Sequence, residues 1–233
     1  MDGRAALLDS GFRANPIFYT MSAFPHARYL KGAHEPTQFV PDTGAEVAIA
    51  GRSNSGKSSA INALTQRHAL ARTSKTPGQT QLINFFELEP GRRLVDLPGY
   101  GFAKVPRPLQ QHWKRLLEAY FRDRESLTAL FIVMDARRPL EEQDWQMLRY
   151  ARARGRMVHL LLTKADKLSR NAAASTLARV RREIGELATA QLFSATANTG
   201  VDEARRQLQG LLQAKEPGDD HSSPGQTSVP QGS

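Results

Sequence analysis

Apolar and polar positions divide the central part of the chain into short apolar runs and longer amphipathic stretches. The apolar runs are bounded by Gly, Pro and polar residues, as buried strands are. They predict strands at 46–50, 82–88, 92–96, 128–135, 157–163 and 190–193. Because helix-like stretches separate most of these runs, the pattern predicts an α/β fold with a mostly parallel sheet.

The amphipathic stretches carry apolar residues at helical spacing. The clearest stripes are Leu109, Trp113, Leu116, Leu117 and Tyr120; Leu177, Val180, Ile184 and Leu187; and Val201, Ala204, Leu208, Leu211 and Leu212. A one-faced apolar row is typical of a helix packed on a sheet, so we interpret these residues as core and not as a cofactor site. A shorter helix is predicted at 59–64.

Two of the predicted strands form a hairpin. Only three residues, ending in Gly91, separate 82–88 from 92–96, and glycine suits the turn of such a hairpin. The two strands must therefore run in opposite directions. We expect a six-stranded sheet with one antiparallel strand.

The ends of the chain differ from its centre. Residues 1–20 show no sustained period and are predicted to form a flexible leader, and Met21 is an alternative start. We expect one domain over 21–214, whose first residues form an extension against it. Residues 215–233 are Pro, Gly, Ser and Gln with a single Val, which predicts a disordered tail.

Length and composition exclude several classes of protein. A chain of 233 residues suits one α/β domain with tails. No apolar run approaches the roughly 20 residues of a membrane span, and the N-terminus has too short an apolar stretch for a secretion signal. The absence of cysteine excludes a disulfide framework and suits a cytoplasmic protein.

Positive charge is concentrated in the centre of the chain. The net charge is +9, and residues 46–214 alone carry +11. Such a basic domain fits a polyanionic partner such as nucleic acid, although arginine can also simply solvate a surface. The candidate phosphate contacts are Arg137, Arg138, Arg149, Arg152, Arg154 and Arg156.

Residues 51–58 fit the phosphate-loop pattern of Gly, four free residues, then Gly-Lys-Ser, between a predicted strand and a predicted helix. Several backbone N–H groups must point into one concavity to hold a polyphosphate, and glycine lets the chain curl closely. Lys57 would neutralise the β- and γ-phosphates, and the Ser58 hydroxyl would hold Mg²⁺. The candidate nucleotide-binding residues are Gly51, Arg52, Ser53, Asn54, Ser55, Gly56, Lys57, Ser58 and Ser59.

Two further segments are expected to face the γ-phosphate. Asp96, Leu97, Pro98 and Gly99 follow the strand 92–96, where the acid can hold Mg²⁺ through water and the Gly99 N–H can sense the phosphate. The polar segment 73–80 would bring a second hydroxyl to Mg²⁺. Its candidate residues, with the two that follow, are Gly78, Gln79, Thr80, Gln81 and Leu82. We expect Lys57, Thr80 and Gly99 to act in catalysis.

A base-reading motif follows the strand 157–163. In Thr163, Lys164, Ala165 and Asp166, the carboxylate can accept hydrogen bonds from the guanine ring N–H and the exocyclic amine, which adenine does not present. Lys164 would lie along the base or brace the phosphate loop.

The last predicted strand ends in Phe193, Ser194 and Ala195, where a backbone N–H can meet the guanine carbonyl oxygen. Five motifs in this order favour GTP over ATP, and open α/β sheets bind ligands at this edge.

The motifs resemble the EngB family of Era-like, translation-factor-related P-loop GTPases. The resemblance covers about residues 18–212 and rests on 51–59, 71–86, 94–101 and 161–168. It implies a three-layer fold with helices on both sheet faces, GTP or GDP with Mg²⁺, assembly of the large ribosomal subunit from its rRNA and proteins, and a role in cell division and septum formation. Family-like Mg²⁺ ligands fall on Ser58 and Thr80, and guanine contacts on Thr163, Lys164, Asp166 and the backbone around Ser194.

Two positions bear on hydrolysis. Many GTPases place a glutamine after the Asp-x-x-Gly motif to orient water, and here that residue is Tyr100, which predicts slow intrinsic hydrolysis. Asn54 resembles an asparagine that helps bind K⁺ in related GTPases, or it only shapes the loop. We expect a monomer without DNA or membrane partners. A P-loop ATPase or small-molecule kinase, and a GTP-gated interaction protein without turnover, remain alternatives.

Overall fold

Seven strands form one sheet in the computed structural model, which describes residues 23–71, 82–100 and 107–213. Their order across the sheet is β1-β3-β4-β2-β5-β6-β7. The strands are β1 Arg28–Ala33, β2 Ala45–Gly51, β3 Ile83–Glu89, β4 Arg92–Asp96, β5 Leu127–Asp135, β6 Met157–Thr163 and β7 Thr189–Leu192. The predicted strands agree with β2 to β7 to within one residue at each end, because each carries apolar residues bounded by Gly, Pro or polar residues.

Four of the five α-helices in the described ranges connect strands, and the fifth follows β7. They are α1 Lys57–Thr65, α2 Arg107–Asp123, α3 Glu142–Arg152, α4 Arg170–Ile184 and α5 Val201–Gln213. Single turns of 3₁₀ helix occur at Pro36–Gln38, Ala165–Lys167 and Gly185–Leu187. No helix within the described ranges has the length and apolar character needed to cross a bilayer.

The sheet is mostly parallel. β2 pairs in parallel with β4 and β5, and β6 pairs in parallel with β5 and β7. β3 runs in the opposite direction and pairs antiparallel with both β1 and β4. Gly91 lies in the β3–β4 turn with φ 74°, a left-handed conformation that glycine adopts without strain. The predicted hairpin and its single reversed strand are therefore confirmed.

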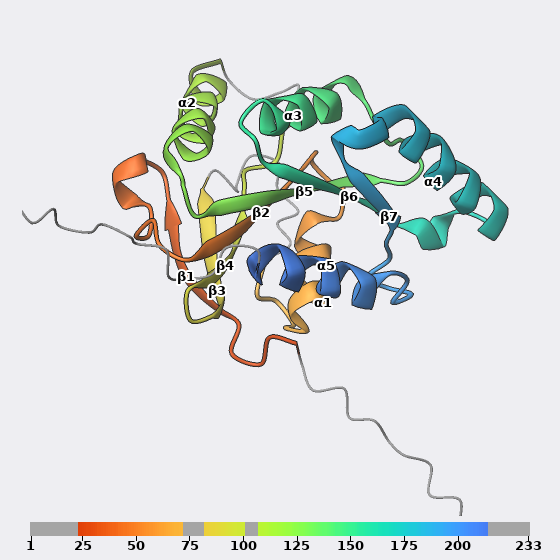
Figure 1. Cartoon of the computed structure of the whole chain (residues 1–233), viewed down its shortest axis with the longest axis horizontal. Coiled ribbons are helices and arrows are strands. Elements are labelled where there is room, and N and C mark those ends of the chain that lie inside the picture. The colour runs from red at the N-terminus through yellow and green to blue at the C-terminus, as the bar shows by residue number, and fades with distance from the viewer. Residues whose placement is uncertain (1–22, 72–81, 101–106, 214–233) are drawn as a thin grey trace, which may run out of the picture.

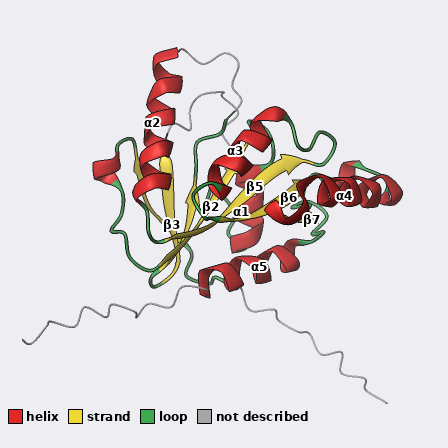
Figure 2. Cartoon of the chain, turned by 45° about the horizontal axis from the view of Figure 1, so that its top comes forward, coloured by secondary structure: helices red, strands yellow, loops and turns green. Residues whose placement is uncertain are grey.

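Helices cover both faces of the sheet, which confirms the three-layer arrangement (Figure 1 and Figure 2). Alternate residues of β5 point to opposite faces, so Ile132 and Phe131 belong to two separate cores. The first core contains residues of α2, α3 and α4, and the second contains residues of α1 and α5. The predicted apolar stripes fill these two cores with side chains from three helices.

The prediction of six strands was wrong by one, because β1 was interpreted as part of an irregular extension. This strand lies at the edge of the sheet, and only Ala33 of its six residues is buried. An edge strand can carry charged residues such as Arg28 and Lys31, which hides the apolar pattern. Leu187 was also misplaced, since it lies beyond α4 and is 41% exposed. The predicted leader and tail lie outside the described residues.

Candidate functional site

The phosphate loop connects β2 to α1 at the C-terminal edge of the sheet. Asn54 and Gly56 adopt left-handed conformations with φ 60° and 93°, which curl the loop back over the end of β2. Ser55 N–H donates to the Arg52 carbonyl at 3.0 Å, and the first helical bond of α1 runs to the Gly56 carbonyl. The segment thus has the strand, loop and helix context that the motif requires.

The loop leaves a set of backbone donors without acceptors. Within the described ranges, no hydrogen bond is made by the N–H groups of Asn54, Gly56, Lys57, Ser58 and Ser59. Buried or converging N–H groups normally find a partner, and a row of them at a helix N-terminus favours an anion. The backbone therefore fits a polyphosphate at the predicted position.

Lys57 and Asp96 meet beside this loop. The Lys57 ammonium contacts the Asp96 carboxylate, and both side chains are largely buried. No group of three or more His, Cys, Asp or Glu that could enclose a metal occurs in the described residues. Mg²⁺ commonly binds proteins through one or two side chains together with phosphate oxygens and water, so Ser58 and Asp96 fit it as partners of a bound nucleotide. Gly78 to Gln81, including Thr80, lie outside the described residues, and Leu82 directly precedes β3.

The base-reading motif braces the phosphate loop. Lys164 donates to the Asn54 carbonyl at 2.6 Å and pairs with Asp135 at 3.1 Å, so the expected brace is confirmed. The Thr163 hydroxyl is buried within hydrogen-bond distance of the Ser55 and Met134 carbonyls. The resemblance implies a guanine contact for Thr163, and in the structure its side chain holds the phosphate loop at the end of β6.

Asp166 is ready to accept hydrogen bonds. The Ser194 hydroxyl donates to one carboxylate oxygen at 2.7 Å, and Lys167 pairs with the other at 3.3 Å. The bond from Ser194 and the charge of Lys167 lower the pKa of Asp166, so the group is ionised at neutral pH. An ionised carboxylate held by its neighbours is the acceptor that a guanine edge requires.

The segment after β7 narrows the choice of backbone donor. Ser194 N–H donates to the Thr199 carbonyl at 2.9 Å, and the Phe193 side chain is buried in the core. Neither group is available to a base. The Ala195 N–H has no acceptor in the described part of the chain, so it is the N–H of this segment that fits the predicted contact with the guanine carbonyl oxygen.

Sequence reasoning missed Asp135, which ends β5 between the two nucleotide-binding regions. Its carboxylate accepts two bonds from the Arg137 guanidinium and one ion pair from Lys164. The bonds from Arg137 hold the pKa of Asp135 far below its usual range. Its place at the end of a predicted parallel strand was the available signal.

The side chains of Arg52 and Tyr100 turn toward α3. Arg52 pairs with Asp144 and Glu141, and the Tyr100 hydroxyl donates to Asp144 at 2.9 Å. The Tyr100 side chain therefore lies against α3, beside Arg52. Leu97 and Pro98 are buried beneath the same segment.

Known proteins match this chain over the same region. The family described as "50S ribosome-binding GTPase" matches residues 46–164, about half of the chain. "Probable GTP-binding protein EngB" of Stenotrophomonas maltophilia is 56% identical over 190 residues, which cover 80% of this chain and 95% of that protein. The chain belongs to the EngB family of GTP-binding proteins. The EngB protein of Xanthomonas oryzae pv. oryzae strain PXO99A is 54% identical over 80% of this chain and 92% of its own length.

Solved structures give the EngB fold independent support. A crystal structure of a probable GTP-binding protein engB matches with a TM-score of 0.59 and 20% identity, over 73% of this chain and all of that one. Aquifex aeolicus Era, solved as the Y63A variant with GDP.AlF4⁻, matches with a TM-score of 0.60 and 19% identity, over 75% of this chain and 59% of Era. At these identities the likeness concerns the P-loop GTPase fold.

We predict that Asp166→Asn exchanges guanine for xanthine. The amide would place a donor against the guanine exocyclic amine, whereas xanthine offers a carbonyl oxygen there. Affinity for GDP should fall by about 100-fold or more, and xanthosine diphosphate should become the better ligand, in fluorescence titrations. Asp202→Asn, the same change at an exposed ion pair with Arg205, is the control and should change neither affinity. Unaltered preference for GDP in Asp166→Asn would remove Asp166 from the base site.

Proposed function

We propose that this EngB protein is a slow GTPase and a nucleotide-controlled switch in the assembly of the large ribosomal subunit. The observation that carries the proposal is the row of unpaired loop N–H groups facing the edge where Asp166 is held ionised. The family description names the 50S ribosome, and the basic central domain suits rRNA as a partner. We extend the proposal to a cytoplasmic monomer needed for cell division and septum formation, as the family resemblance implies.

The residues divide the work of hydrolysis among them. The loop N–H groups and Lys57 bind and orient the phosphates, and the Gly99 N–H meets the γ-phosphate. Ser58, Asp96 and Thr80 are the proposed partners of Mg²⁺, which supplies charge neutralisation on the phosphate oxygens when bound. Thr80 is included on the sequence motif alone, because it lies outside the described residues.

Slow turnover follows from the position of Tyr100. Its hydroxyl is committed to Asp144, and burial raises its pKa well above the ordinary value for tyrosine. It is therefore neither a base nor a group placed to orient water at the phosphates. Asn54 is exposed at the loop and held in its left-handed conformation, which leaves its amide free to help bind K⁺.

We predict a single-turnover rate of about 10⁻⁴ to 10⁻² s⁻¹ for the isolated protein, because positioning and charge act without a water-orienting side chain. Rates should be higher in potassium than in sodium at equal ionic strength. Asn54→Gly tolerates the same φ and should lose that difference. Hydrolysis faster than about 1 s⁻¹ would contradict slow turnover, and equal rates in the two salts would end the role of Asn54 in binding K⁺.

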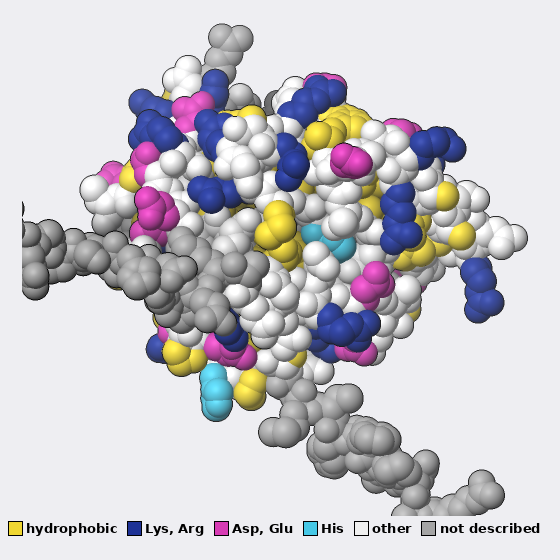
Figure 3. Space-filling model, viewed as in Figure 1, with side chains coloured by type: hydrophobic (Ala, Val, Ile, Leu, Met, Phe, Trp, Pro, Cys, Tyr) yellow, Lys and Arg dark blue, Asp and Glu magenta, His cyan; other side chains and the backbone are white. Residues whose placement is uncertain are grey.

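The six arginines expected to contact rRNA differ in the contacts that their side chains make within the protein. Arg137 pairs with Asp135, Arg154 stacks 3.7 Å above the Tyr150 ring, and Arg156 donates to the Arg124 carbonyl. Arg138, Arg149 and Arg152 are exposed and form no ion pair among the described residues, although Arg149 lies 5.3 Å from the Trp145 ring centroid and Arg152 donates to the Arg156 carbonyl at 3.4 Å. Figure 3 shows Lys and Arg side chains spread along the upper part of the face seen in Figure 1, with acidic side chains between them. We propose that Arg138, Arg149 and Arg152 contact rRNA phosphates.

We predict that Arg138→Glu, Arg149→Glu and Arg152→Glu together weaken co-sedimentation with purified large-subunit precursors in the presence of a GTP analogue. The slope of log affinity against log salt should fall by about 2, since about three phosphate contacts disappear. Arg170→Glu, Arg182→Glu and Arg206→Glu make the same charge change on α4 and α5 and should retain binding. Unchanged association of the first variant at low salt would show that this surface is not the docking site.

A further inference from the structure

One buried carboxylate joins the phosphate loop to the residue after Gly99. Asp144, in the first turn of α3, is fully buried, and it contacts both Arg52 and Tyr100. Arg52 belongs to the phosphate loop, and Tyr100 directly follows Gly99. The three residues lie far apart in the sequence and meet at one point beside the nucleotide edge.

The oxygens of Asp144 are fully engaged. One accepts the Tyr100 hydroxyl at 2.9 Å, and the other accepts the Glu141 N–H at 3.1 Å in a capping box at the start of α3. The Arg52 Nε lies 3.3 Å and 3.2 Å from the two oxygens. Burial raises the pKa of Asp144, and the hydrogen bond from Tyr100 and the charge of Arg52 oppose that shift. Loss of either partner would leave a buried carboxylate short of donors.

Arg52 is fixed in this position by further contacts. Its guanidinium donates to the Arg138 carbonyl at 2.6 Å and pairs with Glu141 at 3.3 Å. Only 18% of its side chain is exposed. Since Arg52 and Asp144 are both held from several sides, the cluster is a rigid support for Tyr100.

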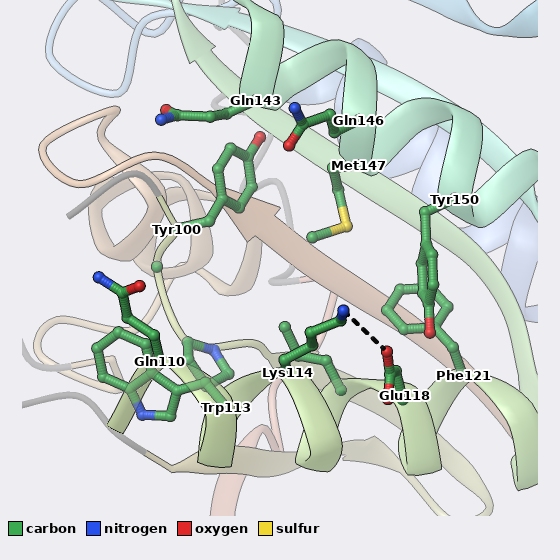
Figure 4. A pocket seen from close by; sticks show the side chains of 13 residues that line it. Tyr100, Gln110, Trp113, Lys114, Glu118, Phe121, Gln143, Gln146, Met147 and Tyr150 are labelled. Atoms are coloured by element: carbon green, nitrogen blue, oxygen red, sulfur yellow. Dashed lines mark ion pairs between the residues drawn. The ribbon is translucent and has the colours of Figure 1, made fainter. Parts of the chain in front are cut away.

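The backbone of Tyr100 is attached to the phosphate loop as well. Its N–H donates to the Gly51 carbonyl and its carbonyl accepts the Ser53 N–H, both at 3.2 Å. Figure 4 shows the Tyr100 side chain extending toward Gln143 of α3 and away from Gln110 of α2. The peptide of Gly99 is therefore fixed against the loop from one side by the side chain and from the other by the backbone.

We propose that Asp144 is a positioning residue that holds Gly99 beside the phosphate loop, through Tyr100 and Arg52, and so favours GTP over GDP. A fixed N–H donor meets a γ-phosphate without the entropy cost of ordering the segment, whereas GDP has no γ-phosphate to gain from it. The inference rests on the guanine-nucleotide site proposed above. It adds a determinant of nucleotide preference outside the five motifs.

The cavity in Figure 4 supplies a matched control. It has a volume of about 560 Å³ and lies between α2 and α3, with Tyr100 at one end and Tyr150 at the other. The Tyr150 hydroxyl is buried and has no hydrogen-bond partner in the described residues. Tyr→Phe can thus be made at two positions that line the same cavity. Tyr100→Phe removes the bond to Asp144, whereas Tyr150→Phe removes a hydroxyl without a described partner.

The test compares affinities for a non-hydrolysable GTP analogue and for GDP. Tyr100→Phe should lower the affinity for the GTP analogue by about fivefold to tenfold, as expected for the loss of a hydrogen bond to a charged acceptor. Its affinity for GDP should stay within about twofold of wild type. Tyr150→Phe should change neither affinity. An unchanged affinity ratio in Tyr100→Phe would overturn the proposal. An increased ratio would also overturn it, since the cluster would then hold Gly99 away from the γ-phosphate.

A double-mutant cycle separates positioning from general stability. Tyr100→Phe, Asp144→Asn and the double variant are compared by affinity ratio and by thermal unfolding. Positioning predicts that the losses in ratio are not additive, because both changes break one contact. Losses confined to the unfolding temperature would show a purely structural role. If wild type bound neither nucleotide, the proposed function itself would fail, whereas normal GDP binding with an unmoved ratio would reject only the inference.

Discussion

Most N–H groups of the phosphate loop bond to no described residue, so bonds within the loop, such as Ser55 N–H to the Arg52 carbonyl, stabilise it only in part. Backbone donors left without acceptors cost free energy, and the loop must be held by other parts of the fold until a phosphate is bound. The support reaches the loop through its backbone carbonyls and through the side chain of Arg52. Thr163 and Lys164 reach it from β6, Tyr100 from the segment after β4, and Asp144 from α3. The base-reading motif and the phosphate loop are consequently in direct contact through Thr163 and Lys164.

Parallel strand order makes this support geometrically simple. β2 lies between β4 and β5, so the segments after all three strands emerge at one edge. At the opposite end of β2, the buried Glu46 accepts bonds from Arg93, Arg124 and Tyr120. That cluster fixes the C-terminal end of α2 to the sheet. Breaking the Glu46 cluster would leave a buried charge unpaired, which is strongly unfavourable. One end of β2 is therefore bonded to its neighbours through this carboxylate, and the other end through the carbonyls of the phosphate loop.

Much of this architecture could be predicted from the sequence, and the failures have physical causes. β2 to β7 carry apolar residues bounded by Gly, Pro and polar residues, so their predicted positions agree closely with the structure. β1 lies at an edge, where burial imposes no such pattern. Asp144 and Asp135 belong to no motif, and their importance comes from distant partners that a single sequence does not pair. The contact of the Thr163 hydroxyl with the phosphate loop could not be predicted, because a motif gives residue types and not side-chain directions.

The central claim is that the joined loop and base motif select guanine nucleotides. Calorimetry on the purified protein, with GDP and ADP titrated separately, tests it most directly. The account predicts a clear binding heat for GDP and an affinity for ADP lower by about 10⁴-fold, because adenine would leave the Asp166 carboxylate without its donors. Comparable heats and affinities for ADP and GDP, or no heat for GDP, would contradict it.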